Sequence, residues 1–427
     1  ENEKGLVIYH NRYSDTRGWI RTSAAYAVKT GNGDEKVLVQ RELKDGLGLR
    51  ADDGVYYIFR DSITGLEYIR NGRELCQQGF YVELGAYKYH VFMDWREVVD
   101  DEEQRYAKLA ESLKGGGVPS MDEAAREIFA RPVLVPFREL ANAGFYSYLL
   151  EKRVNDEEAE PDAALLDEVV TKTQHVVDGI QYLLKIEPVE TIVPVAARSD
   201  FAAILQLPIC AARFPLPKSR KYAAALQYLQ ANLQPQSETD TLAWTTLFSW
   251  ASVRSLGRVT GEEEAITLSR AWLDEWLLGR TIAQTLIALD IADWQAWSAV
   301  NLIKVLTTQQ QWCATDVPAK KRVSQLLDTL LADEDARSFL KVNRYNEIEW
   351  YNKEAFEQLL WGLFAVAAID VIADEGVDPA VVPDVLIAAY DVIKKLQDAQ
   401  ADSEYQVEKL KAAVAPTTRA RKATADA

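Results

Sequence analysis

The chain has 427 residues, of which 65 are acidic and 48 are basic, giving a formal charge of -17. This length predicts two or three domains, and a hydrophobic fraction of 48% is sufficient for their cores. The negative charge repels phosphate backbones and anionic membrane surfaces, so we expect neither nucleic acid nor a membrane among the partners. No signal peptide or long apolar run is visible, which leaves the compartment open with the cytoplasm favoured. The start at Glu1 rather than Met is consistent with a processed or truncated product.

The first hundred residues have the pattern of short strands separated by turns. The segments at residues 5–10, 36–43, 55–61 and 80–95 are rich in β-branched and aromatic side chains. Glycine follows Asn, Asp or Thr at several points between them, as is typical of tight turns. This spacing of short strands predicts an antiparallel β-sandwich over residues 1–100.

The last of these strands shows the clearest alternation. One of its predicted faces carries Tyr87, Tyr89, Val91, Met93 and Trp95, and the other carries Lys88, His90, Phe92 and Asp94. Apolar residues at alternate positions indicate a strand with one buried face, so we expect the first set to point into the core. The domain is predicted to close near Val99.

A Gly-x-Arg-x-Asp pattern occurs at residues 48–52. It resembles the pattern that carries the nucleophilic aspartate of α-amylase-type enzymes, where an arginine keeps the carboxylate ionised. In this chain Asp52 leads into a turn and a strand, whereas a barrel nucleophile needs a following helix and a second carboxylate. We therefore interpret the pattern as a turn, with the catalytic interpretation as the less favoured alternative.

Helical periodicity begins at Ser120, which forms a predicted capping box with Glu123. Helical segments are predicted at residues 120–131, 135–153, 162–186, 199–214, 218–234, 240–256, 262–278, 280–311, 317–331, 351–375 and 378–414. We expect residues 101–154 to pack on the sandwich, residues 155–162 to form an acidic linker, and residues 163–414 to form an all-α domain. The polar tail at residues 415–427 is predicted to be disordered. The fold class is thus a multidomain α+β protein.

Most of the tryptophans lie in the helical part of the chain. Trp272 and Trp276 are four residues apart, and Trp294 and Trp297 are three apart, so each pair shares one face of a helix. Such pairs can form a platform for sugar rings or a partner helix, or they can belong to the core. We favour the core, because burial of aromatic area is a main source of core stability.

The cysteines and histidines have no spacing that is typical of a metal site. Cys76, Cys210 and Cys313 are far apart and odd in number, so neither a disulfide framework nor a zinc site is predicted. His10 and His90 fall in predicted strands, where a structural role is commoner than metal ligation. We predict no metal, no cofactor and no catalytic residue in this chain.

Several long stretches carry a resemblance to a known family. They are residues 5–21 (GLVIYHNRYSDTRGWIR), 45–50 (DGLGLR), 59–71 (FRDSITGLEYIRN), 87–98 (YKYHVFMDWREV) and 351–361 (YNKEAFEQLLW). This set resembles the region that follows the catalytic barrel in large bacterial members of the α-amylase superfamily, most clearly over residues 5–100. In that family the barrel supplies the catalytic carboxylates and a β-sandwich follows it. No barrel can be traced through this chain, so the resemblance carries over no catalytic residue.

Two hypotheses follow. In the first, the chain is the non-catalytic accessory region of an α-amylase-like glycoside hydrolase, whose partners are the catalytic barrel of the same parent protein and α-glucan, contacted through exposed aromatics such as Trp19. It predicts an exposed apolar patch on the sandwich. In the second, the chain is a stand-alone scaffold or protein-binding module with a polar sandwich surface and a concave helical face. A third alternative, enzymatic activity of the helical part, has no readable acid/base spacing to support it.

Overall fold

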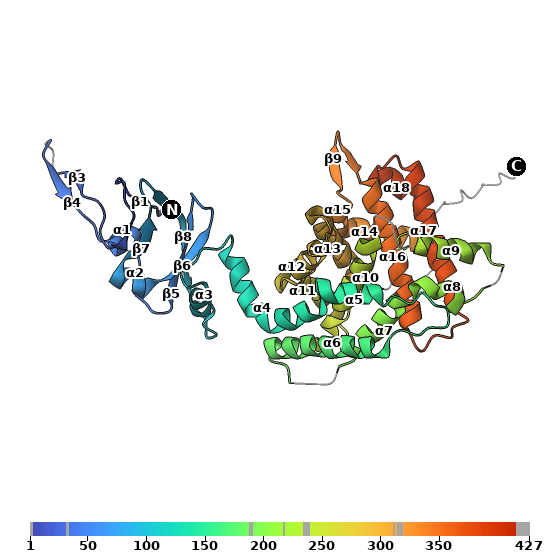
Figure 1. Ribbon diagram of the computed structural model, residues 1–427. Coiled ribbons are helices and arrows are strands. Elements are labelled where there is room, and N and C mark those ends of the chain that lie inside the picture. Colours follow the sequence, from blue (N-terminus) through green and yellow to red (C-terminus); the bar gives the residue numbers. More distant parts are fainter. Residues whose placement is uncertain are drawn as a thin grey trace. The chain divides into compact units, whose positions relative to one another are not determined.

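The computed structural model of the protein describes residues 3–30, 34–187, 191–216, 218–233, 240–310, 312–313 and 319–415. The chain divides into two compact units between Arg131 and Pro132, within a single helix (Figure 1). Small antiparallel sheets dominate the first unit and helices dominate the second. The predicted α+β class is therefore confirmed. The predicted disordered tail lies outside the described residues, except for its first residue, Ala415.

The first unit is built from short strands, and its buried side chains form two hydrophobic clusters. Its strands are β1 (Leu6–Tyr9), β2 (Thr16–Ile20), β3 (Tyr26–Lys29), β4 (Lys36–Val39), β5 (Val55–Asp61), β6 (Glu67–Asn71), β7 (Phe80–Leu84) and β8 (Tyr89–Val99). Four of them form an antiparallel sheet in the order β1-β8-β5-β6, while β2 pairs with β7 and β3 pairs with β4. The short helices α1 (Leu43–Leu47) and α2 (Gly72–Gln78) complete this unit on its core side.

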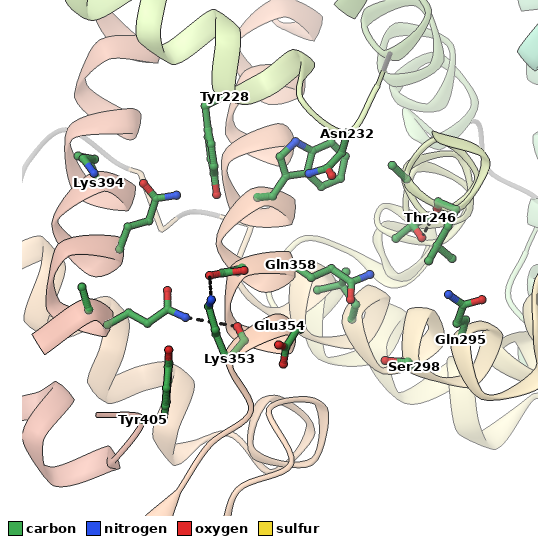
Figure 2. A pocket seen from close by; sticks show the side chains of 18 of the residues that line it. Tyr228, Asn232, Thr246, Gln295, Ser298, Lys353, Glu354, Gln358, Lys394 and Tyr405 are labelled. Atoms are coloured by element: carbon green, nitrogen blue, oxygen red, sulfur yellow. Dashed lines mark hydrogen bonds and ion pairs between the residues drawn. The ribbon is translucent and has the colours of Figure 1, made fainter. Parts of the chain in front are cut away.

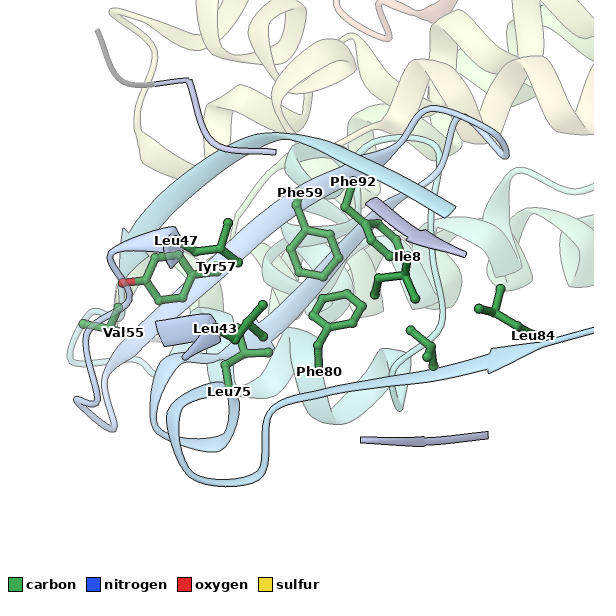
Figure 3. Close-up of a cluster of buried hydrophobic side chains, with 11 residues drawn as sticks. Ile8, Leu43, Leu47, Val55, Tyr57, Phe59, Leu75, Phe80, Leu84 and Phe92 are labelled. Atoms are coloured by element: carbon green, nitrogen blue, oxygen red, sulfur yellow. The ribbon is translucent and has the colours of Figure 1, made fainter. Parts of the chain in front are cut away.

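The core of this unit lies between the four-stranded sheet and strand β7. Phe59 of β5, Phe80 of β7 and Phe92 of β8 meet at its centre, with ring centroids 4.8–5.3 Å apart (Figure 3). Leu43 and Leu75 close it from the two short helices. Two β layers with a shared apolar interior give the sandwich-like arrangement that the turn spacing predicts.

The predicted faces of β8 are wrong before the bulge at Asp94 and right at Trp95. Phe92 points into the core and is 5% exposed, whereas Tyr87 and Tyr89 are 63% and 51% exposed. The pairing of β8 with β5 shifts by one residue near Asp94, which has a φ of +54°. This bulge returns Trp95 to the core side, where it stacks on Phe59. A regular alternation therefore cannot describe the whole strand.

The opposite face of the sheet is only partly covered. Helix α3 (Arg105–Leu113) and the first half of α4 (Met121–Leu140) pack on its β5–β6 half through Leu109 and Met121. Ser120 caps α4 as predicted, since its hydroxyl accepts a hydrogen bond from the backbone N–H of Glu123. The predicted helix end at Arg131 is wrong, because α4 continues through Pro132 and Pro136.

The second unit is mostly helical. Its elements are α5 (Ala143–Glu151), α6 (Ala163–Leu184), α7 (Val193–Leu205), η1 (Leu207–Ile209), α8 (Cys210–Arg213), α9 (Arg220–Gln230), α10 (Asp240–Val253), η2 (Leu256–Thr260), α11 (Ala265–Glu275), α12 (Leu278–Ile287), α13 (Asp293–Thr308), α14 (Ala319–Ala332), α15 (Glu334–Phe339), β9 (Asn343–Tyr345), β10 (Ile348–Trp350), α16 (Lys353–Ala373), α17 (Val382–Asp402) and α18 (Val407–Val414). The acidic segment at residues 155–162 connects α5 to α6 inside this unit, where Glu160 pairs with Arg213.

A ring of four helices forms the centre of this unit. Helices α7, α10, α13 and α16 each pack on the next, and α16 packs back on α7. Residues 243–253 of α10 are all buried, so this helix is enclosed by its neighbours. By length and composition α16 could span a membrane, as could α7 joined to residues 207–213 across a bend, but 78% of the apolar window in α16 is buried inside the unit. A buried core helix passes the same test.

Two long predicted helices are interrupted. The prediction for residues 280–311 corresponds to α12 and α13, which are separated by a turn in which Asp290 has a φ of +62°. The prediction for residues 378–414 corresponds to α17 and α18, separated at residues 403–406. The hairpin of β9 and β10 has no counterpart in the sequence prediction, because its strands are only three residues long.

Candidate functional site

The uncovered half of the four-stranded sheet carries an exposed aromatic face. We define the aromatic face as Val7, Tyr9, Tyr13, Tyr87 and Tyr89, which are all more than half exposed. Tyr9 and Tyr89 are direct partners across strands β1 and β8, and the rings of Tyr13 and Tyr87 lie 6.3 Å apart. Large aromatic side chains that gather in solvent indicate an interaction surface.

The sequence of β1 explains why both of its faces are apolar. Leu6 and Ile8 point into the core, and the intervening residues Val7 and Tyr9 point outwards. Because β1 is the edge strand of the sheet, its outer backbone groups are also free of a further strand among the described residues. Neither the α3 helix nor α4 covers this half, since their contacts are with Tyr56, Ile58 and Ile69.

Trp19, the predicted carbohydrate contact, lies on a different surface. It is 46% exposed on β2 and pairs across the strands with Tyr81 of β7, whose ring centroid is 5.2 Å away. The neighbouring residues Phe80 and Val82 of β7 point into the core, so Tyr81 and Trp19 point away from it. The structure therefore does not bring Trp19 together with the aromatic face, which belongs to the other layer.

The residues of the Gly-x-Arg-x-Asp pattern form a loop that is hydrogen-bonded to β8. Arg50 donates hydrogen bonds of 2.8 Å to Asp52 and to Glu97, and the hydroxyl of Tyr57 donates to Glu97 at 2.8 Å. Burial is the main cause that raises the pKa of Tyr57 to about 12. Both nearby carboxylates are engaged by Arg50, and the segment leads into a turn and β5, as expected for the structural interpretation.

The histidines of the first unit make structural contacts. His90 Nδ1 lies 2.9 Å from Oδ2 of the fully buried Asp61, and His10 Nε2 lies 2.8 Å from the carbonyl oxygen of Ser14. Burial acts to raise the pKa of Asp61, but hydrogen bonds from His90, Ile63 and Thr64 outweigh it and hold the pKa below its ordinary value. Within the described residues, no three His, Cys, Asp or Glu side chains are grouped so that they could hold a metal ion.

The second unit contains a pocket of about 760 Å³ at one end of the helix ring. The first turns of α10, α13 and α16 line it through residues such as Thr246, Gln295 and Gln358, and the last turns of α9 and α17 close it (Figure 2). This volume is within the range of about 300–1,000 Å³ that is typical of small-molecule sites. Sequence patterns do not predict this pocket, because its walls come from helices distant along the chain.

The lining of this pocket combines aromatic rings with amides. Tyr228, Trp294, Trp361 and Tyr405 are its aromatic residues, and Trp294 is 66% exposed. Five amide side chains also line it: Asn232, Gln295, Gln358, Gln397 and Gln400. Polar groups that both donate and accept, next to rings that can stack, suit a ligand with many hydroxyl groups.

One of the two tryptophan pairs is buried and the other is exposed. Trp272 and Trp276 are 2% and 4% exposed, with ring centroids 4.1 Å apart, so the predicted core role of this pair is confirmed. Trp294 and Trp297 are 66% and 44% exposed, so the core prediction is wrong for the second pair. They lie in the first turns of α13, where the helix ring leaves their face open.

Comparisons of the chain with protein-family models, with curated proteins and with solved structures found no match.

Proposed function

We propose that this chain is the non-catalytic C-terminal accessory region of an α-amylase-like glycoside hydrolase, which stabilises the catalytic barrel and contacts α-glucan. The observation that carries the proposal is the aromatic face of the first unit. Val7, Tyr9 and Tyr89 are more than half exposed on one half of a sheet whose other half is covered by helices. Tyr13 and Tyr87 are also more than half exposed, in the segments that follow β1 and precede β8. The accessory hypothesis expects an exposed apolar patch of this kind.

The position of β1 supports docking at this face. Strand β1 supplies Val7 and Tyr9 and is the edge of the sheet. A catalytic domain joined ahead of residue 6 would emerge beside the aromatic face, so a short connection would suffice to cover it. Tyrosine rings at such a face bury a large apolar area and keep their hydroxyl groups in contact with water.

The carboxylates of the pocket do not favour hydrolysis by this chain. Glu354 and Glu357 are both on the first turns of α16, and Glu357 lies 3.8 Å from Lys353. Glycoside hydrolysis uses two carboxyl groups that flank the scissile bond from opposite sides. Two carboxylates on one wall, one of them paired with lysine, support binding rather than cleavage.

The scaffold hypothesis is supported by one of its two expectations. The pocket gives the second unit the concave helical face that this hypothesis expects. Its other expectation is a polar surface on the sandwich, whereas the aromatic side chains of Tyr9 and Tyr89 are exposed there. The accessory hypothesis accounts for the surface of the first unit and is therefore preferred.

The experiment begins with the reading frame that encodes the chain. If the proposal is correct, an α-amylase-type barrel precedes residue 1 in frame, and the separately produced barrel binds the chain in a calorimetric titration. Tyr9→Ser combined with Tyr89→Ser is expected to weaken this binding at least about tenfold, since buried aromatic anchors dominate interfaces. Tyr182→Ser, at a 76% exposed tyrosine of the second unit, is the matched control and should bind like the unmodified chain. A frame without a barrel would refute the proposal.

A further inference from the structure

The pocket of the second unit is balanced in charge. Its charged lining consists of two lysines and two glutamates, namely Lys353, Lys394, Glu354 and Glu357. Both lysines already have carboxylate partners, because Lys353 lies 3.8 Å from Glu357 and Lys394 lies 2.9 Å from Asp398. No arginine lines the pocket among the described residues. The lysines that line the pocket are thus engaged by carboxylates, and the nearby Lys341 lies over the ring of Trp294, so a neutral ligand fits better than a phosphorylated or acidic one.

Several polar groups of the pocket are available to a ligand. Gln295 and Gln358 are half-buried, and neither side chain has a hydrogen bond to another described residue. The hydroxyl of Tyr228 is buried and points into the pocket (Figure 2). The Gln397 amide is close to this hydroxyl, but no hydrogen bond of ordinary geometry joins them. Unpaired polar groups inside a pocket are costly unless a ligand or water satisfies them.

An aromatic platform lies at the mouth of the same pocket. The indole of Trp294 is 66% exposed, and the ammonium group of Lys341 lies 6.0 Å from the ring centroid. The ring of Tyr405 is 40% exposed in the lining contributed by the residues after α17. Flat, exposed rings beside amide groups match the two surfaces of a sugar, which has apolar C–H faces and a hydroxylated rim.

From these observations we infer that the pocket formed by α9, α10, α13, α16 and α17 is a binding site for a neutral oligosaccharide. Trp294 stacks on a sugar ring, while Gln295, Gln358 and the Tyr228 hydroxyl bind its hydroxyl groups. This inference goes beyond the proposed function, because the site is in the second unit and needs neither the catalytic barrel nor the aromatic face.

The test is calorimetric titration of the full chain with maltoheptaose, cellohexaose and xylohexaose, and with hexagalacturonate as an anionic comparison. At least one neutral oligosaccharide should bind saturably, and hexagalacturonate should not bind. Trp294→Ala should weaken binding about tenfold through loss of ring stacking, and Gln358→Ala should weaken it several-fold. Trp297→Ala is the matched control, because Trp297 is exposed on the same helix and is not part of the pocket lining.

Three outcomes would overturn the inference. They are the failure of every neutral oligosaccharide to bind at millimolar concentration, equal binding of hexagalacturonate, and binding that Trp294→Ala leaves unchanged. Loss of binding in Trp19→Ala alone would assign the sugar to the β2–β7 surface instead. Because Trp294 is exposed, its replacement should leave the unfolding midpoint unchanged, and circular dichroism of each variant checks this. None of these titrations contains the barrel, so their failure is separate from failure of the docking proposal.

Discussion

Tyr9 and Tyr89 are direct partners across strands β1 and β8, and both side chains are more than half exposed. Aromatic residues at facing positions of an antiparallel pair are close enough for their rings to pack. In this sheet the pair lies on the face that no helix of the first unit covers. The pair is therefore placed to contribute to an interface much more than to the stability of its own unit.

This relationship predicts a small effect of the two tyrosines on stability. Replacing both by serine should lower the free energy of unfolding by less than about 1 kcal/mol, since an exposed cross-strand pair contributes only about 0.2–1 kcal/mol. Urea unfolding followed by circular dichroism measures the change. A loss of several kcal/mol would mean that the pair belongs to the core, contrary to its exposure.

Arg254 is expected to be the most sensitive charged residue of the second unit. It follows α10 and pairs with Asp200 of α7, at 3.3 Å, and with Asp370 of α16, while its guanidinium lies 4.4 Å from the ring centroid of Trp250. Arg254→Ala would leave the buried Asp200 and the half-buried Asp370 without this ion-pair partner, at a cost of about 3–5 kcal/mol. Denaturant unfolding tests this loss.

The matched control for this prediction is Arg344→Ala. Arg344 also pairs with a carboxylate, Glu347, but its side chain is 64% exposed. Exposed ion pairs contribute about 0–1 kcal/mol. Equal destabilisation by the two substitutions would contradict the role of burial at Arg254.

Asp200 predicts a dependence of stability on pH. Burial, opposed by Arg254 and reinforced by Asp370, raises the pKa of Asp200 to about 7. The native state therefore holds this proton more tightly than the unfolded state, so its contribution to stability is complete below about pH 4 and declines as pH rises towards 7. In this window, the free energy of unfolding of the unmodified chain should fall by up to about 1.4 kcal/mol per pH unit relative to that of Asp200→Asn. Parallel slopes for the two proteins between pH 4 and 7 would contradict the shifted pKa.

Replacing Gly179 by alanine is expected to lower the stability of the protein, although the same change usually stabilises a helix. A Cβ atom at this position of α6 would lie 2.2 Å from the carbonyl oxygen of Pro132, which receives no hydrogen bond from Pro136 because proline lacks an N–H. Glycine to alanine in a helix ordinarily stabilises by about 1 kcal/mol. Gly179→Ala should instead destabilise by roughly 1–3 kcal/mol through overpacking. Gly46→Ala, where a Cβ meets nothing within 4 Å, is the control, and thermal unfolding compares the two.

The sequence predicts regular elements of this fold better than their faces and ends. The sequence predicts strand β5 with its observed bounds, because residues 55–59 form a continuous β-branched and aromatic run and glycine turns flank the segment. The faces of β8 could not be predicted, because the bulge at Asp94 depends on its pairing with β5. Likewise, the break at Asp290 depends on the packing of α12 on α13 rather than on a proline or glycine signal.

The candidate sites, like the fold, are only partly predictable from the sequence. Helical spacing indicates that Trp294 and Trp297 share a face, as Trp272 and Trp276 do, but spacings of three and four residues cannot tell which face of a helix is buried. Trp19 is expected to be an exposed aromatic, and the structure shows that its exposure depends on its pairing with Tyr81 of β7. The pocket combines α9, α10, α13, α16 and α17, and only the tertiary fold brings these segments together.

We propose above that the chain stabilises a catalytic barrel through its aromatic face. If a barrel is encoded in the same frame, the most direct measurement is the temperature at which that barrel loses half of its amylase activity, with and without the chain in excess. At a chain concentration of about 100 times Kd, docking stabilises the barrel by about 2.7 kcal/mol, so this temperature should rise. The Tyr9→Ser, Tyr89→Ser chain should give no rise. An unchanged temperature with the unmodified chain would contradict the account.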